Sequence, residues 1–232
     1  MIRKLSVFLL AVTAIAAAQT VPGKTLFVEC SQPTPAKQVF SPISLAKSGG
    51  WKAYIEVTVQ DHCLHTTRLW AARENRPWRL LLMISPTREE GGNGMQILGW
   101  APNSRMLLAR AGYWQYGTDG GAREEILAVD ARTGLVYNPD LEKLREDRKP
   151  QQCGYEVVDA GFRSDPNVVI LVRLRWFTYV DEGTELAEIP AEKRCTEGDE
   201  TWSFNYAGEV KKVDNSQPLI LFKKFVGNPR TK

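Results

Sequence analysis

The feature that most restricts the fold is a strand–turn–strand pattern that occurs three times. The three segments are ISLAKSGGWKAYIEV, ILGWAPNSRMLLARA and DAGFRSDPNVVILVR, which begin at Ile43, Ile97 and Asp159. When they are aligned, turn-forming residues coincide, an apolar run follows each turn, and Trp100 falls on Phe162. Short apolar runs bounded by turn residues are typical of β-strands, so the pattern predicts three β-hairpins in an all-β chain.

A second correspondence extends each hairpin into a larger unit. Cys63 is followed by Trp70, and Cys195 by Trp202, at the same spacing. The middle copy lacks the cysteine, but EEILAVDARTGLVY at 124–137 predicts two strands joined by a turn at 130–134. Each unit is therefore expected to contain four short strands. The units cover residues of about 24–90, 91–148 and 149–226.

Several of these runs, such as MLLA and VVILV, are continuously apolar rather than alternating. Continuous runs are expected of strands that are covered on both faces. A single four-stranded sheet cannot bury both of its faces, whereas sheets packed face to face can. The sequence therefore predicts a stack of small antiparallel sheets.

The stretch WAPNSRMLL, which begins at Trp100, is followed by ILAVDARTG at 126–134. Together they resemble a blade of the TolB-like and WD-repeat β-propellers. The resemblance implies a propeller-like fold, and such propellers close with four to eight blades. Three units are clear here, and strand-like residues 24–28 and 218–222 are candidates to pair with each other or to contribute to a fourth.

One short helix is expected between the second and third units. Asn138 is the predicted cap, Pro139 the first helical residue, and Leu141 and Leu144 the inward-facing residues.

The first eighteen residues have the pattern of a secretory signal peptide. Arg3 and Lys4 precede an apolar run that is short for a membrane span, and the small residues of AAA at 16–18 follow it. The alternative is an uncleaved anchor. We expect cleavage after Ala18, a single β-rich domain over residues 19–232, a secreted or periplasmic location, and no membrane span after cleavage.

All four cysteines, Cys30, Cys63, Cys153 and Cys195, lie beyond the signal peptide. An even number in an exported chain predicts two disulfides. Equivalence of the repeat units favours Cys30 with Cys63 and Cys153 with Cys195. Pairings between distant units, such as Cys30 with Cys195, would instead suit a ring whose ends meet.

The charge balance gives no case for nucleic-acid binding. The chain has 30 Lys and Arg against 27 Asp and Glu, and loss of Arg3 and Lys4 brings it close to neutral. It contains no phosphate-binding glycine loop and no Gly-x-Ser-x-Gly nucleophile motif, and no cofactor is expected. These observations favour a role other than catalysis.

Two groups of side chains are candidate sites. His62 and His65, with Cys63 between them, form a possible metal site or a simple disulfide loop. Tyr113, Trp114 and Tyr116 are candidate aromatics for binding a protein or carbohydrate ligand, or for packing at a sheet edge.

Taken together, the sequence predicts an exported β-repeat protein that serves as a binding or scaffold module. The alternatives are a secreted hydrolase that acts on envelope or extracellular polymers, and a metal-binding module that uses His62 and His65.

Overall fold

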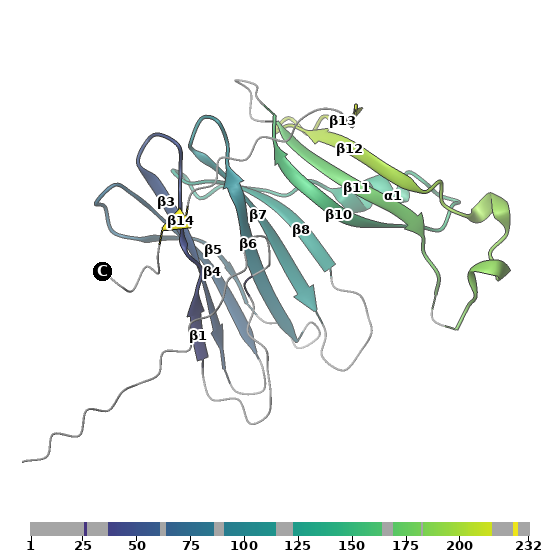
Figure 1. The fold of residues 1–232 in the computed structure, drawn as a ribbon, viewed down its shortest axis with the longest axis horizontal. Helices are drawn as coiled ribbons and strands as arrows, with labels where there is room; N and C mark the ends of the chain where they lie inside the picture. The colour runs from purple at the N-terminus through teal and green to yellow at the C-terminus, as the bar shows by residue number, and fades with distance from the viewer. Residues whose placement is uncertain are drawn as a thin grey trace, which may run out of the picture.

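The computed structural model describes Leu26 and residues 37–60, 64–85, 91–114, 123–163, 169–181, 183–214 and 225–226. These residues form three antiparallel sheets, which are stacked in chain order (Figure 1). We call them sheets 1, 2 and 3. The prediction of an all-β fold built from a stack of small antiparallel sheets is confirmed.

In sheet 1, two short strands lie in succession along one edge of the long strand β3. Ser41 lies between them: its N–H donates to the Ile55 carbonyl at 2.9 Å, and its hydroxyl accepts from the Ile55 N–H at 2.9 Å. Pairing with β3 therefore continues across the break at Pro42, which has no N–H to donate. The strands are β1 (Lys37–Phe40), β2 (Ile43–Leu45), β3 (Trp51–Val59), β4 (His65–Arg73), β5 (Arg79–Ile84) and β14 (Phe225–Val226).

Sheets 2 and 3 are four-stranded meanders in which each strand pairs with the next along the chain. Sheet 2 contains β6 (Gly92–Trp100), β7 (Met106–Trp114), β8 (Arg123–Asp130) and β9 (Val136–Tyr137). Sheet 3 contains β10 (Cys153–Phe162), β11 (Ile170–Thr178), β12 (Gly198–Phe204) and β13 (Val210–Val213).

The three predicted hairpins join β2 to β3, β6 to β7 and β10 to β11. Trp100 and Phe162, which coincide in the sequence alignment, are the last residues of β6 and β10. Both are fully buried. Trp70 and Trp202 likewise lie in the corresponding strands β4 and β12. The sequence correspondences therefore mark equivalent positions in the sheets.

The two ends of the chain pair with sheets 1 and 2. Leu26 exchanges backbone hydrogen bonds of 2.8 and 3.3 Å with Met95 of β6, while β14 pairs with Ile43 and Ser44 of β2. Each segment thus pairs with part of an edge strand, β6 in sheet 2 and β2 in sheet 1. Of the residues predicted to pair with each other or to contribute to a fourth unit, only Leu26 is described, whereas the rest of 24–28 and all of 218–222 lie outside that part.

Sheet 2 lies between the other two, and both of its faces are buried (Figure 1). In β7, Leu107 and Ala109 pack toward sheet 1, whereas Met106 and Leu108 pack toward sheet 3. This alternation explains the continuously apolar run in the sequence, because every position of a doubly covered strand faces a neighbour.

Asp130 shapes the DARTG turn between β8 and β9. Its Oδ1 accepts the backbone N–H groups of Arg132 at 2.7 Å and Thr133 at 3.1 Å, and its Oδ2 accepts from the Arg105 guanidinium. Burial opposes ionisation, but these hydrogen bonds outweigh it and hold the pKa of Asp130 below its ordinary value. The predicted turn at 130–134 is confirmed.

We expect the variant Asp130→Asn to lose part of the acid dependence of stability. Because the pKa of Asp130 is lowered in the folded chain, its carboxylate stabilises the fold above its unfolded pKa, and this stabilisation is lost as the pH falls through the folded pKa. Asparagine keeps an acceptor for the turn but cannot ionise. Urea unfolding from neutral pH down to about pH 3 checks this, and the prediction is wrong if both proteins lose stability in parallel.

A short helix, α1 (Leu141–Glu146), connects sheet 2 to sheet 3. Leu141 and Leu144 are buried, as predicted. The cap is Asp140 rather than Asn138, because the Asp140 carboxylate accepts the Lys143 N–H at 3.0 Å and Pro139 lies outside the helix. No helix in the described parts of the chain is long and apolar enough to span a bilayer.

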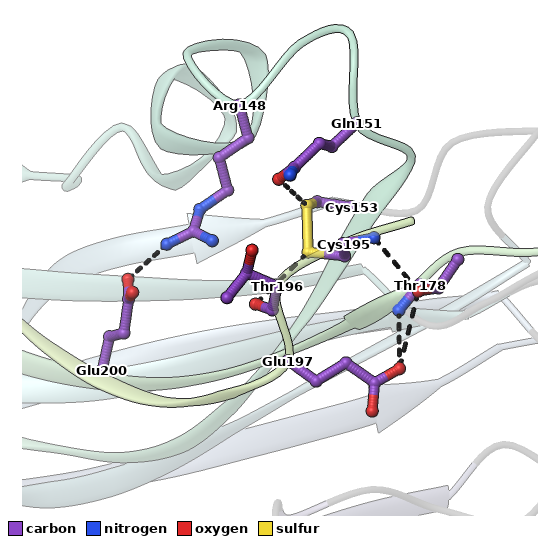
Figure 2. Close-up of a disulfide and its surroundings, with 8 residues drawn as sticks. All are labelled: Arg148, Gln151, Cys153, Thr178, Cys195, Thr196, Glu197 and Glu200. Atoms are coloured by element: carbon purple, nitrogen blue, oxygen red, sulfur yellow. Dashed lines mark hydrogen bonds and ion pairs between the residues drawn. A yellow bond between two sulfur atoms is a disulfide. The ribbon is translucent and has the colours of Figure 1, made fainter. Parts of the chain in front are cut away.

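A disulfide joins Cys153, at the start of β10, to Cys195 (Figure 2). The disulfide holds the connection between β11 and β12 against sheet 3. This connection contains the 3₁₀ turns η2 (Leu186–Glu188) and η3 (Ala191–Lys193). One of the two predicted pairs is therefore confirmed, whereas Cys30 and Cys63 lie outside the described residues.

An ion pair lies beside this disulfide (Figure 2). The Arg148 guanidinium bonds the Glu200 carboxylate and lies 3.8 Å from the centre of the Trp176 ring. Lys212 also donates to Glu200, at 2.6 Å. Burial disfavours the charge, but hydrogen bonds from Lys212 and Arg148 outweigh it and hold the pKa of Glu200 below its ordinary value. The charges thus connect the turn after α1 to the far strands of sheet 3.

Candidate binding face

Sheet 1 has one face in the core and one face directed away from sheet 2. Ala53, Ile55 and Val57 of β3 belong to the core, and successive strand residues point to opposite faces. Contacts across the sheet place further residues on the second face. We call this surface the outer face of sheet 1, and it contains Phe40, Lys52, Tyr54, Glu56, Arg68, Trp70, Trp78, Leu80 and Met83.

Four aromatic rings from four parts of the sheet meet on this face. The Tyr54 ring lies at the centre, with its centroid 6.0 Å from that of Phe40, 6.4 Å from that of Trp70 and 4.7 Å from that of Trp78. The Trp70 ring is nearly parallel to it, at 14°, whereas the Trp78 ring meets it edge-on at 85°. Such offset and edge-on pairs add to the energy of area burial, so the rings form a packed cluster.

Glu56 fixes the orientation of this cluster. Its Oε2 accepts the Trp70 Nε1–H at 2.8 Å, while its Oε1 accepts from Gln38 and lies 3.5 Å from the Arg68 guanidinium. Arg68 also donates to the Thr58 hydroxyl at 3.0 Å. The carboxylate is almost fully buried, and both its oxygens are satisfied. Trp70 is therefore held in one orientation before any ligand arrives, which lowers the entropic cost of binding.

The face also carries apolar side chains that are open to solvent. Leu80 is 40% exposed and Met83 is 49% exposed, although both lie beside the aromatic cluster. The Lys52 ammonium lies 5.0 Å from the centre of the Trp78 ring. Trp, Tyr, Phe, Met and Arg are the residue types enriched in the centres of protein interfaces. This face is therefore rich in the residue types that gather at such centres.

The predicted aromatic site at Tyr113, Trp114 and Tyr116 has a different setting. Tyr113 packs at the border of the core between sheets 1 and 2, and its hydroxyl donates to Glu125 at 3.2 Å. Trp114 meets the His65 ring edge-on at 5.5 Å and covers Gly92 so closely that a Cβ there would lie 2.3 Å from its indole nitrogen. Tyr116 lies outside the described residues. Tyr113 and Trp114 thus fill space at a sheet edge.

The histidines proposed as metal ligands are likewise placed only in part. His65 is fully buried on the core face of β4, against Trp114. His62 and Cys63 lie outside the described residues. Where the structure describes the chain, no three His, Cys, Asp or Glu side chains gather in a group that could hold a metal.

A cavity of about 430 Å³ lies where β8 approaches α1 and β10. Its carboxylates have partners: Glu142 accepts the Tyr155 hydroxyl at 2.8 Å, Glu125 bonds Arg123 at 2.9 Å, and Glu124 lies 3.7 Å from Arg110. Burial and the bond to Glu142 raise the pKa of Tyr155 well above its ordinary value. These contacts lie within sheet 2 or between α1 and β10, and we assign the cavity no catalytic role.

Comparisons with known proteins give no family. No protein-family model matches the sequence, and no curated protein matches it. Among solved structures, an ACO/RPE65 chimera is 11% identical with a TM-score of 0.38, and the match covers 76% of this chain and 38% of the other. A Synechocystis apocarotenoid oxygenase variant is 11% identical with a TM-score of 0.34, and the match covers 79% and 40%. The chain spans less than half the length of these structures, and no conclusion is drawn from the likeness.

The sequence indicates some, but not all, of the residues on the outer face of sheet 1. Lys52, Tyr54 and Glu56 alternate with core residues in WKAYIEVTV, a pattern that identifies a second face. Trp78, by contrast, lies in the connection before β5 and reaches Tyr54 only because the chain folds back over β4. No local pattern assigns it to the same site.

Proposed function

We propose that the protein is an exported binding module and that a protein partner docks on the outer face of sheet 1. The observation that carries this proposal is the ordered aromatic cluster, in which Glu56 holds Trp70 beside the exposed side chains of Leu80 and Met83. Large apolar side chains in such a patch on an exposed sheet face mark an interaction site.

A protein fits this face better than a carbohydrate does. Sugars bind by lying flat on an open aromatic ring. Tyr54 is only 9% exposed, and its ring lies between Trp70 and Trp78. The exposed aliphatic side chains beside the cluster would add to a contact with protein.

The proposal also includes export of the protein and a relationship of its fold to the β-propellers. The signal-peptide pattern at residues 1–18 supports export, and so does the disulfide between Cys153 and Cys195, because disulfides persist in oxidising compartments. The DARTG turn and the equivalent burial of Trp100 and Phe162 support our assignment of the three sheets as blades of the TolB-like or WD-repeat kind.

In-cell photo-crosslinking tests the docking face. We expect a photoreactive amino acid at Met83 to give a defined protein adduct, because this side chain is exposed beside the aromatic cluster. The same amino acid at Leu135, an exposed position in the turn of sheet 2, is the matched control and should give none. Adding Trp78→Ala should lower the Met83 adduct at least about tenfold, as loss of an interface anchor does.

Equal crosslinking from Met83 and Leu135, or none from Met83, would contradict the proposal. Cleavage of the chain after Ala18 is measured in the same samples from the intact mass of the exported protein. A carbohydrate ligand would be indicated instead if polysaccharides quenched tryptophan fluorescence in the wild type and not in Trp70→Ala.

A further inference from the structure

The strand β5 forms one edge of sheet 1. It pairs with β4 on one side, and no other strand in the described part of the chain pairs with it. Among the described residues, no backbone hydrogen bond is formed on its second side. An unpaired edge presents N–H and C=O groups that are ready to pair with a further strand.

The edge strands β9 and β13 have features that discourage such pairing, whereas β5 has few of them. In sheet 2, β9 is only two residues long, and in sheet 3, β13 carries Lys211 and Lys212. The sequence of β5 is RLLLMI, in which the only charged residue is Arg79 at its start. This apolar edge is therefore suited to accept a strand from another protein.

The register shows which backbone groups of β5 point to its free side. Ile55 of β3 directs its N–H and C=O groups away from β4, because both bond at 2.9 Å to the residue between β1 and β2. Its partner Leu69 therefore directs its own groups toward β5, where it meets Leu82. The next residue, Met83, must then point its N–H and C=O to the free edge. The bulge at Leu81 precedes this regular part.

The free edge is continuous with the docking face proposed above. Leu80 and Met83 lie on the outer face of sheet 1 and are exposed, whereas Leu81, Leu82 and Ile84 pack against the core. Side chains of paired residues lie on the same face of a sheet. A strand added to β5 would therefore place a side chain beside Met83 on the outer face of sheet 1.

The start of β5 is basic. Residues 73–79, RENRPWR, contain three arginines and one glutamate. The Arg79 guanidinium donates to the carbonyls of Ala131 and Arg132, both at 2.8 Å, which brings a further arginine to this end of the strand. The nearby carboxylate of Asp130 already has an arginine of its own sheet as partner. Carboxylates on a partner would thus complement this end of the edge.

We propose that the partner adds an extended strand to β5, antiparallel to it, and that this segment has alternating apolar residues followed by Asp or Glu at its C-terminal end. The inference rests on the docking face proposed above and names what occupies it. Antiparallel addition places the C-terminal end of the segment at the basic start of β5. In this mode, main-chain hydrogen bonds supply affinity and alternate side chains supply specificity.

Hydrogen exchange of the purified chain, followed by NMR, tests whether the edge is free. The Met83 amide should exchange at least about tenfold faster than those of Leu82 and Ile84, which the register directs toward β4. Equally slow exchange at all three amides would show that the edge is already occupied, and would overturn the inference.

In-cell crosslinking from Leu80 tests the added strand. Both Met83→Pro and Met83→Ala remove the exposed side chain, but only proline also removes the N–H. An edge position whose N–H makes no bond within the sheet tolerates proline. We expect the adduct of Met83→Pro to be at least about threefold weaker than that of Met83→Ala, because a main-chain hydrogen bond to the partner is lost. Equal urea midpoints of the two variants confirm that the fold is retained.

Mass spectrometry of the adduct identifies the segment that lies against Leu80, and we expect it to alternate apolar residues and to end in Asp or Glu. Arg76→Glu at the basic end should lower adduct formation at least about threefold. Arg163→Glu, an equal change of charge at an exposed position of sheet 3, is the matched control and should have no effect. These two measurements decide the inference even if Met83→Pro does not fold.

The inference is overturned if folded Met83→Pro and Met83→Ala give equal adducts, if Arg76→Glu has no effect, or if the crosslinked segment lacks carboxylates. In each of these cases a defined adduct of the wild type still retains the docking face. Absence of any adduct from the wild type, at both Met83 and Leu80, would instead remove the docking face and the added strand together.

Discussion

Replacing Trp100 with alanine is expected to lower the free energy of unfolding by about 3–5 kcal/mol. The indole is fully buried between sheets 1 and 2, and its Nε1–H donates to the Ser44 hydroxyl at 3.1 Å. Removing it leaves a cavity and an unpaired hydroxyl in the core. Because a domain of this kind is stable by about 5–15 kcal/mol, the loss is a large fraction of the total. Urea denaturation followed by circular dichroism measures it.

Two variants separate the cavity from the hydrogen bond. Trp100→Phe keeps most of the apolar volume and loses the donor, so we expect a smaller loss of about 1–3 kcal/mol. Ser44→Ala removes only the acceptor and leaves the indole N–H unpaired. If Trp100→Ala unfolds the chain completely, Trp100→Phe still reports the hydrogen bond. A loss below about 1 kcal/mol in Trp100→Ala would contradict a central role for this residue.

Removing the disulfide by Cys153→Ala with Cys195→Ala should cost about 4 kcal/mol. The cysteines are 42 residues apart, and this is the cost that the chain-entropy model gives for a loop of that length. Alanine is preferred to serine because both positions are buried, and a buried hydroxyl without a partner would add its own penalty.

The location of the effect is as informative as its size. Amide exchange should increase first in β10 and in the segment 179–197, which the disulfide holds against sheet 3 (Figure 2). Sheet 1 provides the internal control. Unchanged stability of the double variant would show that the hydrogen bonds of this segment, such as that of Tyr179 N–H to the Gln152 carbonyl at 2.8 Å, hold it without the cross-link.

The fold was largely predictable from sequence because the three units repeat the same local signals. Turn residues in all three units, the buried aromatic before the turn in the second and third units, and the DARTG turn of the second unit all lie within short windows of the chain. The helix was located for the same reason. Its cap was misassigned because Asn138 and Asp140 both have suitable side chains, and only the folded backbone determines which one reaches the Lys143 N–H.

The ends and the candidate site depend on distant contacts. Local composition indicates neither the pairing of β14 with β2 nor that of Leu26 with Met95. The aromatic cluster brings Phe40, Tyr54, Trp70 and Trp78 together through strand register, whereas the sequence drew attention to the contiguous aromatics at 113–116.

The pairing of β14 with β2 also affects the order of folding. Sheets 2 and 3 are meanders whose strands meet soon after they emerge from the ribosome, so their loops close quickly. Sheet 1 is different, because one edge of β2 pairs with β14, which lies about 180 residues downstream. A linear array of sheets could open one sheet at a time. Because β14 pairs with β2, the segment that follows sheet 3 is joined to sheet 1. This pairing favours a single cooperative folding transition that is completed only after β14 has been synthesised.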